Sequence, residues 1–556
     1  MLRTIGLRWS ILVACSMAIL CCSVVARAQT VDRGFNPGAN QVVWSLAVQP
    51  DGKILVGGGF TGLGDGTGTT TRNHIGRLNV DGTVDLTFNP GTNSIVQAIA
   101  VQPDGKILIG GNFSAVGGGT GLATVRNGIA RLNADGTVDL TFDPGANKVV
   151  YALVVQPDGK ILVGGDFSML GGGGSGITMR NALGRLNADG SLDTFNPGAS
   201  KLSGVPIVYS MALQPDGRVV VGGYFTGLGG GSGATARNYL GRINADGSLD
   251  TLFDPGSTFY VNALALQADG KILVGGDFIG LGGGTGLTSL LHIGRLNSDG
   301  SVDATFNPGT EAEVHTLGVQ ADGKILAAGY FKWIGGAGNP DTRSVRNYIG
   351  RINPDGSVDA GFNAGADNIV DAVLIQPDGG IVAGGHFASV SGGDGTGVAD
   401  VGIARFPTTG PAIQTLTLTG DGTIEAWARS GAGPEVSSVT FEFSFDGSFY
   451  SLLGSGTRTA GGWELTTGPN LPNARKLWLR ARGYYGSGHQ NGSGSIVESI
   501  LIQEPTPPPT SPAAANSSGG CSHFSVGSAS PSSVALLLVL GPLALLTLRR
   551  RRGRRR

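Results

Sequence analysis

The chain has 556 residues, of which 98 are glycine, 40% are hydrophobic and only four are cysteine. Such a chain can bury a core, and it lacks the third-residue glycine period of collagen, so its glycines belong in many turns and bulges. The formal net charge is −1, but three of the first 28 residues and seven of the last eight are arginine. Between these ends the chain carries 29 basic and 40 acidic residues. An acidic body of this kind is a poor binder of polyanions, which argues against nucleic acid as a partner.

Residues 1–28 have the pattern of a secretory signal peptide. Two arginines give a basic start, residues 11–25 are largely apolar, and the small residues required by a signal peptidase end at Ala28. We expect cleavage after Ala28, and therefore an exported protein. Three of the four cysteines leave with the signal, so the mature chain keeps only Cys521 and has no intramolecular disulfide.

Residues 31–406 consist of one unit repeated seven times. A Phe-Asn/Asp-Pro-Gly motif or a near copy begins at Phe35 and recurs at intervals of 53 to 58 residues. Each unit also contains a Gln-Pro/Ala-Asp-Gly turn and a Gly/Ala-Arg pair. The first unit resolves into four expected strands, at 42–48, 53–58, 74–79 and 83–88. Asp-Gly turns between alternating segments indicate hairpins, and four antiparallel strands in this period predict a β-propeller blade.

The two ends of the repeat predict a closed ring. The seventh unit stops after its third strand, at Phe406, whereas residues 31–38 parallel residues 84–91, which form the fourth strand of the first unit. We expect the N-terminal strand to complete the seventh blade and so to remove an exposed sheet edge. The sequence therefore predicts an all-β protein in which residues 29–410 form a seven-bladed β-propeller.

Two motifs of the repeat carry a family resemblance. They are the run from Leu46 to Gly58, Leu-Ala-Val-Gln-Pro-Asp-Gly-Lys-Ile-Leu-Val-Gly-Gly, and the Phe-Asn-Pro-Gly motif. They resemble the delta-60 repeat family of bacterial β-propeller-like proteins over residues 31–406. The resemblance implies a bacterial cell-surface or secreted protein, and it brings no catalytic residues with it.

A second domain is expected at residues 411–503, where about six short alternating segments replace the repeat. Ninety-odd residues of this kind predict a small immunoglobulin-like β-sandwich, with Trp427, Trp463 and Trp478 in its core. The following Pro/Ser/Thr-rich stretch, residues 504–520, is expected to be an extended linker.

The C-terminal tail, residues 521–556, has three parts: Cys521, an apolar segment at 534–548 and an arginine-rich end at 549–556. With the Gly-Gly pair that precedes Cys521, it resembles bacterial sorting signals of the Gly-Gly or myxobacterial type. That resemblance implies that the tail is cut and the protein passed to the surface, with Cys521 beside the processing or lipid-attachment point. A single C-terminal transmembrane anchor is the alternative, although fifteen apolar residues are fewer than the about 20 that a span needs.

No catalytic constellation is evident in the sequence. It contains no nucleophile elbow, zinc-binding His-Glu-x-x-His motif or phosphate loop. His74 and His292 share a repeat position that other blades fill with glycine, alanine or tyrosine, and His315, His386 and His489 look isolated. The sequence therefore predicts no catalytic residues, no metal site and no cofactor. Calcium at the recurring Asn-x-Asp-Gly pattern remains an alternative to a plain turn, which we favour.

Two sets of arginines recur with the repeat. The Gly/Ala-Arg set is expected to form structural ion pairs with aspartates of the same or the next blade. The second set ends the long loops, on the face that carries the Phe-Asn-Pro-Gly connections, and function tends to reside on longer loops. Its members are the candidate ligand-binding residues Arg72, Arg126, Arg180, Arg237 and Arg346. The alternative is that these arginines anchor the loops.

The function expected from the sequence is that of an exported, surface-associated, non-enzymatic binding or adhesion protein. The propeller would bind an unknown extracellular glycan or protein, and only the tail would contact the membrane. The alternative is a carbohydrate-active hydrolase or lyase. Such an enzyme needs carboxylates or histidines that are unique to particular blades and face the centre, and the near-identity of the blades argues against it.

Overall fold

The computed structural model describes residues 30–119, 123–336, 343–391, 397–407, 410–418, 425–465, 471 and 475–505. The signal sequence with Ala28 and the tail with Cys521 lie outside these residues. The described chain forms β-strands and turns, with a 3-10 turn, η2 (His489–Asn491), near its end. Within this part of the chain no helix is long and apolar enough to cross a membrane.

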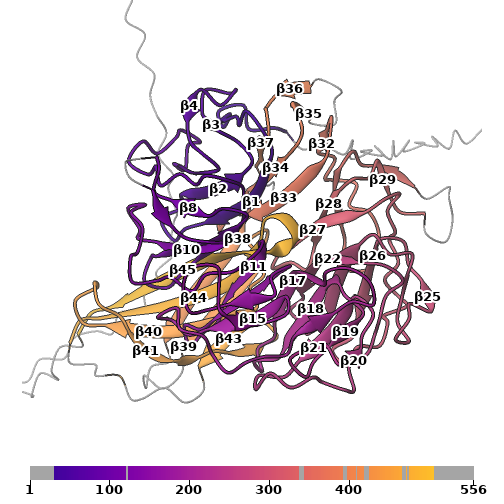
Figure 1. Ribbon diagram of the computed structural model, residues 1–556. Helices are drawn as coiled ribbons and strands as arrows, with labels where there is room; N and C mark the ends of the chain where they lie inside the picture. The colour runs from indigo at the N-terminus through magenta and orange to yellow at the C-terminus, as the bar shows by residue number, and fades with distance from the viewer. Residues whose placement is uncertain are drawn as a thin grey trace, which may run out of the picture. The chain divides into compact units, whose positions relative to one another are not determined.

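The repeat forms seven blades of three antiparallel strands each (Figure 1), and one parallel pair, Ala100 with Gly494, joins the sheet of the second blade to a sheet of the second domain. The inner strands are β1 (Val43–Val48), β6 (Val96–Val101), β11 (Val150–Val155), β17 (Ile207–Leu213), β22 (Val261–Leu266), β27 (Val314–Val319) and β33 (Val370–Ile375). The middle strands are β2 (Ile54–Gly58), β7 (Ile107–Gly111), β12 (Ile161–Gly165), β18 (Val219–Tyr224), β23 (Ile272–Gly276), β28 (Ile325–Gly329) and β34 (Ile381–Gly385). The third strands are β5 (Ile75–Leu78), β10 (Ile129–Leu132), β15 (Leu183–Leu186), β21 (Leu240–Ile243), β26 (Ile293–Leu296), β31 (Ile349–Ile352) and β37 (Ile403–Phe406).

The expected fourth strand is reduced to a single pairing. In the first blade Val84 forms an isolated bridge with Leu78, and the chain then turns at Asp85 instead of continuing as a strand to Phe88. The turn forms because the Asp85 carboxylate accepts hydrogen bonds from the backbone N–H and the hydroxyl of Thr87. The prediction of four full strands per blade was therefore wrong for the outermost one.

Each long loop carries a short hairpin of its own. The pairs are β3 (Gly62–Leu63) with β4 (Thr70–Thr71), β8 (Ala115–Val116) with β9 (Thr124–Val125), β13 (Met169–Leu170) with β14 (Thr178–Met179), β19 (Gly227–Leu228) with β20 (Thr235–Ala236), β24 (Gly280–Leu281) with β25 (Thr288–Ser289), β29 (Trp333–Ile334) with β30 (Ser344–Val345), and β35 (Ser389–Ser391) with β36 (Gly397–Ala399). Two further short strands, β16 (Ala199–Ser200) and β32 (Gly365–Ala366), extend the fourth and seventh of these hairpins. The Phe-Asn-Pro-Gly connection lies against the same loop, since Gly64 N–H donates to the Gly38 carbonyl at 3.1 Å. The long loops and these connections therefore share one face, as predicted.

One interaction recurs in every blade, and we call it the arginine node. In the first blade Arg77 Nε donates to Asp85 Oδ2 at 2.9 Å, and the guanidinium lies 4.3 Å from the centre of the Phe88 ring. Arg77 also donates to the backbone carbonyl of Ala134, in the Asp-Gly turn of the next blade, at 2.7 Å. Lys53 makes a second ion pair with Asp85 at 2.9 Å. The predicted arginine–aspartate pairs are thus present, within the same blade.

The N-terminal segment supplies the missing node of the seventh blade, as the sequence predicted. Asp32 Oδ2 forms an ion pair with the Arg405 guanidinium at 2.6 Å, and this guanidinium lies 4.2 Å from the centre of the Phe35 ring. Asp32 N–H also donates to the Arg405 carbonyl at 2.9 Å, as Asp85 N–H does to Arg77. Arg405 in turn reaches the Val80 carbonyl of the first blade at 2.6 Å. These bonds connect the last blade to the first.

The blades pack closely because the middle strands carry glycine. A Cβ atom on Gly57 would lie 2.8 Å from Cγ1 of Val96 in the next blade. The same contact joins the last blade to the first, where a Cβ on Gly384 would lie 2.7 Å from Cγ1 of Val43. The absence of a side chain at these glycines therefore lets a valine of the neighbouring blade pack closely.

Residues beyond the repeat form two four-stranded antiparallel sheets. One contains β38 (Ala412–Leu418), β39 (Glu425–Gly431), β42 (Thr457–Thr459) and β43 (Gly462–Leu465), and the other β40 (Ser438–Ser444), β41 (Ser451–Ser455), β44 (Leu477–Ser487) and β45 (Ser493–Gln503). Trp427 and Trp463 are buried in one apolar cluster with Phe441 and Leu479, as predicted. Trp478 is only half-buried and lies under the turn at Gly447, so it is not a core residue. The immunoglobulin-like assignment of this domain stays a prediction.

The β44–β45 hairpin extends beyond this domain into the centre of the propeller. Residues 477–484 pair with β40, whereas η2 at the hairpin tip contacts the inner strands β17, β22, β27 and β33 (Figure 1). We call residues 485–497 the plug. The second domain lies against the face of the propeller that carries the short Asp-Gly turns, which we call the short-turn face. There Ala321 N–H donates to the Gly433 carbonyl at 2.8 Å. The plug therefore enters from the short-turn face and runs toward the long-loop face.

Polar atoms of the plug bond to free backbone groups of the inner strands. Apart from one parallel pair between Ala100 of β6 and Gly494 of β45, each inner strand pairs only with its middle strand, so its other edge presents N–H and C=O groups to the channel. The plug residues that meet these groups are Ser487, Gly488, Asn491, Gly492, Ser493 and Ser495. The Asn491 side chain bonds both backbone groups of Leu317, accepting from its N–H at 2.9 Å and donating to its C=O. The plug thus satisfies edges that a bare channel would leave to water.

We expect the Asp85→Ala variant to lose about 3 kcal/mol or more of unfolding free energy, because Arg77 would remain buried without its carboxylate. The Asp85 and Arg77 side chains are 6% and 8% exposed. Asp81→Ala is the matched control, since the Asp81 carboxylate is exposed and bonds only to Thr83 in its own turn. Urea unfolding followed by circular dichroism measures both. Equal losses in the two variants would contradict the role assigned to the node.

A second variant tests the plug. Asn491→Ala should lower the free energy of unfolding by about 1–3 kcal/mol, because both backbone groups of Leu317 lose their partner inside the channel. Amide hydrogen exchange at Leu317 should accelerate in the variant. Unchanged exchange at Leu317 would show that the plug does not protect this strand.

Candidate functional site

One position of the inner strand differs from blade to blade. It follows a valine near the start of the strand and holds Trp44, Gln97, Tyr151, Tyr209, Asn262, His315 and Asp371. A β-bulge lies at this position in each blade, as between Val43 and Ser45 in the first. A bulge directs a side chain away from the regular alternation of the strand. Residues of neighbouring blades meet here: the rings of Tyr151 and Tyr209 are 5.5 Å apart.

Two further variable positions lie beside the first. One follows the last glycine of the middle strand and holds Gly59, Asn112, Asp166, Tyr224, Asp277, Tyr330 and His386. The other precedes the third strand and holds His74, Gly128, Ala182, Tyr239, His292, Tyr348 and Gly402. We call the end of the channel that these three positions surround the mouth. It lies on the long-loop face, where the inner strands begin.

The position shared by His74 and His292 has a backbone conformation that favours glycine. Its five non-glycine residues have φ between 61° and 66°. Left-handed backbone in a non-glycine residue costs about 1 kcal/mol or more, and such strain gathers at functional sites. Histidine and tyrosine at this strained position therefore support a functional role for the mouth.

Aromatic rings fill one side of the mouth, across blades three to five. The aromatic cluster consists of Tyr151, Tyr209, Tyr224, Tyr239, Phe259 and Tyr260, whose adjacent ring centres lie 4.3 to 6.3 Å apart. All six side chains are half-buried. Burial, aided by the charge of Asp166, raises the pKa of Tyr151 to about 12. The Tyr151 phenol therefore stays protonated at neutral pH and can donate a hydrogen bond.

Acidic and histidine side chains fill the other side of the mouth. In blade five Asp277 lies 3.7 Å from His292. In blades six and seven Glu313 Oε1 lies 3.3 Å from His315 Nε2, and His315 Nδ1 lies 2.9 Å from Asp371 Oδ1. These contacts form an arc that begins beside Tyr260 of the aromatic cluster.

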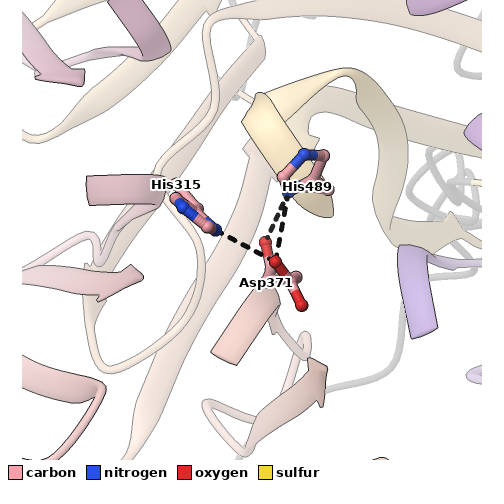
Figure 2. A group of neighbouring side chains, drawn as sticks. All are labelled: His315, Asp371 and His489. Atoms are coloured by element: carbon pink, nitrogen blue, oxygen red, sulfur yellow. Dashed lines mark hydrogen bonds and ion pairs between the residues drawn. The ribbon is translucent and has the colours of Figure 1, made fainter. Parts of the chain in front are cut away.

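Asp371 is the centre of this arc. Its second carboxylate oxygen lies 2.7 Å from His386 Nδ1, and its first lies 3.9 Å from Nδ1 of His489 at the tip of the plug (Figure 2). We call His315, Asp371, His386 and His489 the histidine cluster. The expectation that His315, His386 and His489 are isolated was wrong. They converge because the ring joins blades six and seven and the plug brings His489 from a different domain.

Burial and hydrogen bonding shift the pKa values of the cluster in opposite directions. Burial alone would raise the pKa of Asp371, but hydrogen bonds from His315 and His386 lower it to about 2. Burial would lower the pKa of His315, but its two carboxylate partners raise it to about 9. Burial lowers the pKa of His489 to about 4. At neutral pH the cluster therefore holds a carboxylate, a charged His315 and a neutral His489.

The loop arginines predicted to bind a ligand are buried beneath the long loops. The guanidinium of Arg72 donates to the carbonyls of Thr71 and Asp85 at 2.8 and 3.1 Å. The equivalent arginines, Arg126, Arg180, Arg237 and Arg346, make the same two kinds of bond. Each is at most 9% exposed. This arrangement favours the alternative role of loop anchors, and the candidate site is not built on them.

Two hollows lie in or beside the channel. One, of about 90 Å³, lies inside the channel between the plug and the later parts of the inner strands of blades two to seven, away from the mouth, and it is lined by apolar residues such as Leu213 and Leu266 together with Ser493. The other, of about 370 Å³, adjoins the mouth between blades seven and one and is lined by Asn40, Gly402 and His386. His386 therefore contacts both Asp371 and this open hollow.

Comparisons with known proteins agree with the propeller. Six segments match the family model described as a domain of unknown function (DUF5122) β-propeller, at residues 49–88, 102–142, 156–195, 214–253, 267–306 and 320–362. No curated protein matches the chain. Among solved structures the chain is similar to the crystal structure of the C-terminal WD40 domain of Sif2, with 11% identity, a TM-score of 0.22 and coverage of 71% of this chain and 81% of that one. The family match and the observed strands confirm the all-β propeller class, whereas the delta-60 resemblance and the sorting tail stay predictions.

In the seventh blade the loop-arginine position holds Asp400. This aspartate is fully buried, and both of its carboxylate oxygens lack a hydrogen-bond partner among the described residues. Burial, with the charge of Asp32, raises the pKa of Asp400 to about 7. The unfolded chain releases this proton near pH 4, so the stability of the folded state should fall as the pH rises from about 4 to about 7.

We expect Asp400→Asn to raise the unfolding free energy at pH 8 by on the order of 2 kcal/mol and to leave it nearly unchanged at pH 4. Thermal unfolding of wild type and variant across this pH range measures the effect. Asp51→Asn, which removes an exposed turn carboxylate, controls for the loss of one negative charge. A difference between wild type and Asp400→Asn that does not depend on pH would contradict the assignment.

Proposed function

We propose that the protein is an exported, surface-associated, non-enzymatic protein that binds a carbohydrate at the mouth of its propeller channel. The observation that carries the proposal is the gathering of blade-specific side chains at this one place, while the rest of each blade repeats. A β-propeller is a suitable interaction platform, and function resides in sites placed on it. Export and surface association are supported by the signal pattern of residues 1–28 and by the resemblance of the tail to sorting signals.

The chemistry of the mouth suits a sugar. The half-buried rings of the aromatic cluster offer flat apolar surfaces with hydroxyl groups at their edges, and ligand sites combine such surfaces with a few placed polar groups. Asp166 and Asp277 lie beside these rings, and burial raises the pKa of both carboxyls. Together these groups can pack against the C–H face of a sugar ring and bond its hydroxyls. A polyanion is disfavoured by the same carboxylates.

The proposal is tested by a glycan array and a panel of matrix proteins, both probed with the purified full-length protein. In the Tyr209→Ala/Tyr260→Ala double variant, affinity for the bound glycan should fall by roughly 5- to 150-fold, because two ring contacts of about 0.5–1.5 kcal/mol each are lost. Phe449→Ala is the matched control, since this aromatic residue of the second domain is 84% exposed. Glycan binding that survives the double variant, or binding to a protein alone, would contradict the proposal.

A carbohydrate-active enzyme is the second candidate, favoured by one observation. His315 and Asp371 occupy an inner-strand position that no other blade fills with a histidine or an acidic residue, and with Asp277 they gather at the centre, as an enzyme on this scaffold would require. The test is to incubate the protein with its bound glycan and to measure new reducing ends or unsaturated products. Product formation that disappears in Asp277→Asn would replace the binding role with catalysis.

A further inference from the structure

Three possible metal ligands meet where the plug tip approaches blades six and seven. His315 lies on β27, Asp371 on β33 and His489 on η2 (Figure 2). One ligand atom of each lies within 4.8 Å of the other two. The three come from elements that are far apart in the sequence, and only the closed ring and the inserted plug bring them together.

We propose that His315, Asp371 and His489 bind a divalent first-row transition metal ion, of which Zn²⁺ is the probe. Two imidazoles and one carboxylate form a common ligand set for such ions, with further positions left for water or a ligand. At metal–ligand distances of about 2.1 Å, ligand atoms in a tetrahedral site lie about 3.4 Å apart. Asp371 Oδ1 is 2.9 Å from His315 Nδ1 and 3.9 Å from His489 Nδ1, and all three ligand atoms lie within 4.8 Å of one another, so shifts of about 0.5 to 1.4 Å would place them around an ion. The ion would replace the proton that His489 Nδ1 donates to the Asp371 backbone carbonyl at 3.3 Å.

The surrounding groups orient the ligands as a metal site requires. Glu313 Oε1 lies 3.3 Å from His315 Nε2, so Nε2 can donate to it while Nδ1 faces Asp371. Histidine ligands typically donate their second nitrogen to a carboxylate in this way. His386 engages Asp371 Oδ2 at 2.7 Å, which leaves Oδ1 for the ion.

The ligand set also selects among ions. Calcium and magnesium prefer oxygen ligands, and Asp371 is the only carboxylate in the three-residue set, so neither ion should bind here. The inference goes beyond carbohydrate binding and does not depend on it, because the aromatic cluster lies across different blades. A bound ion would link the plug to two blades and so make the second domain part of the mouth.

The experiment uses the full chain without a histidine tag and with its four cysteines replaced by serine, so that thiols cannot bind the ion. After treatment with chelator, calorimetric titration with Zn²⁺ should give one site per chain. Zn²⁺ should raise the melting temperature, because the site exists only in the folded protein. Co²⁺ should give visible absorption bands of a site with nitrogen ligands, and Ca²⁺ and Mg²⁺ should give neither signal.

Variants separate this site from adventitious binding. His489→Ala and Asp371→Asn should abolish the titration signal and the Co²⁺ bands, and Glu313→Gln should weaken binding by roughly 10- to 100-fold. His74→Ala, which removes a mouth histidine outside the cluster, should leave both unchanged, and circular dichroism checks that each variant is folded. Absence of a saturable Zn²⁺ site in the unsubstituted cluster, or a site that persists in folded His489→Ala, would overturn the proposal.

Discussion

The arginine node is the interaction on which the propeller depends. In the first blade one guanidinium pairs with Asp85, stacks on Phe88 and bonds a carbonyl of the next blade. A single side chain therefore fixes both the outer edge of its own blade and the position of its neighbour. In six of the seven blades the node bonds a backbone carbonyl of the next blade, and in the last blade Arg405 reaches Val80 of the first blade in this way. Closure of the ring thus follows from the same contact that builds each blade.

The repeated part of the fold could be predicted from the sequence because its contacts are local and recur seven times. The Asp-Gly turns, the alternating strands and the offset between residues 31–38 and the seventh unit each had a direct physical meaning. The fourth strand of the blade was predicted to be longer than it is. The Asp85 carboxylate accepts a hydrogen bond from the backbone of its own turn, which ends the strand, and an alternating sequence pattern does not reveal such a bond. The loop arginines were interpreted as a possible binding set because the sequence does not show that backbone carbonyls surround them.

The candidate site could have been found in part by comparing the blades with one another. The varied position after Val43, Val314 and Val370 marks the mouth, and its residues His315 and Asp371 stand out against an otherwise constant motif. His489 could not have been found in this way, because it lies in a domain of different sequence. Its place in the channel depends on the unpaired edges of the inner strands, which Asn491 and the plug serines satisfy only in the folded molecule.

The plug makes the second domain part of the site. Several hydrogen bonds fix the register of the plug against the inner strands. Among them, Val48 N–H donates to the Ser495 hydroxyl and Leu317 N–H donates to the Asn491 side-chain oxygen. A slip of one residue along a strand would move the tip by about 3.4 Å and turn alternate side chains to the opposite face. His489 would then leave Asp371, and the serines would leave the edges that they satisfy. The bonds that hold the hairpin in the channel therefore also set the geometry of the histidine cluster, so the stability of the channel and the chemistry of the mouth depend on the same register.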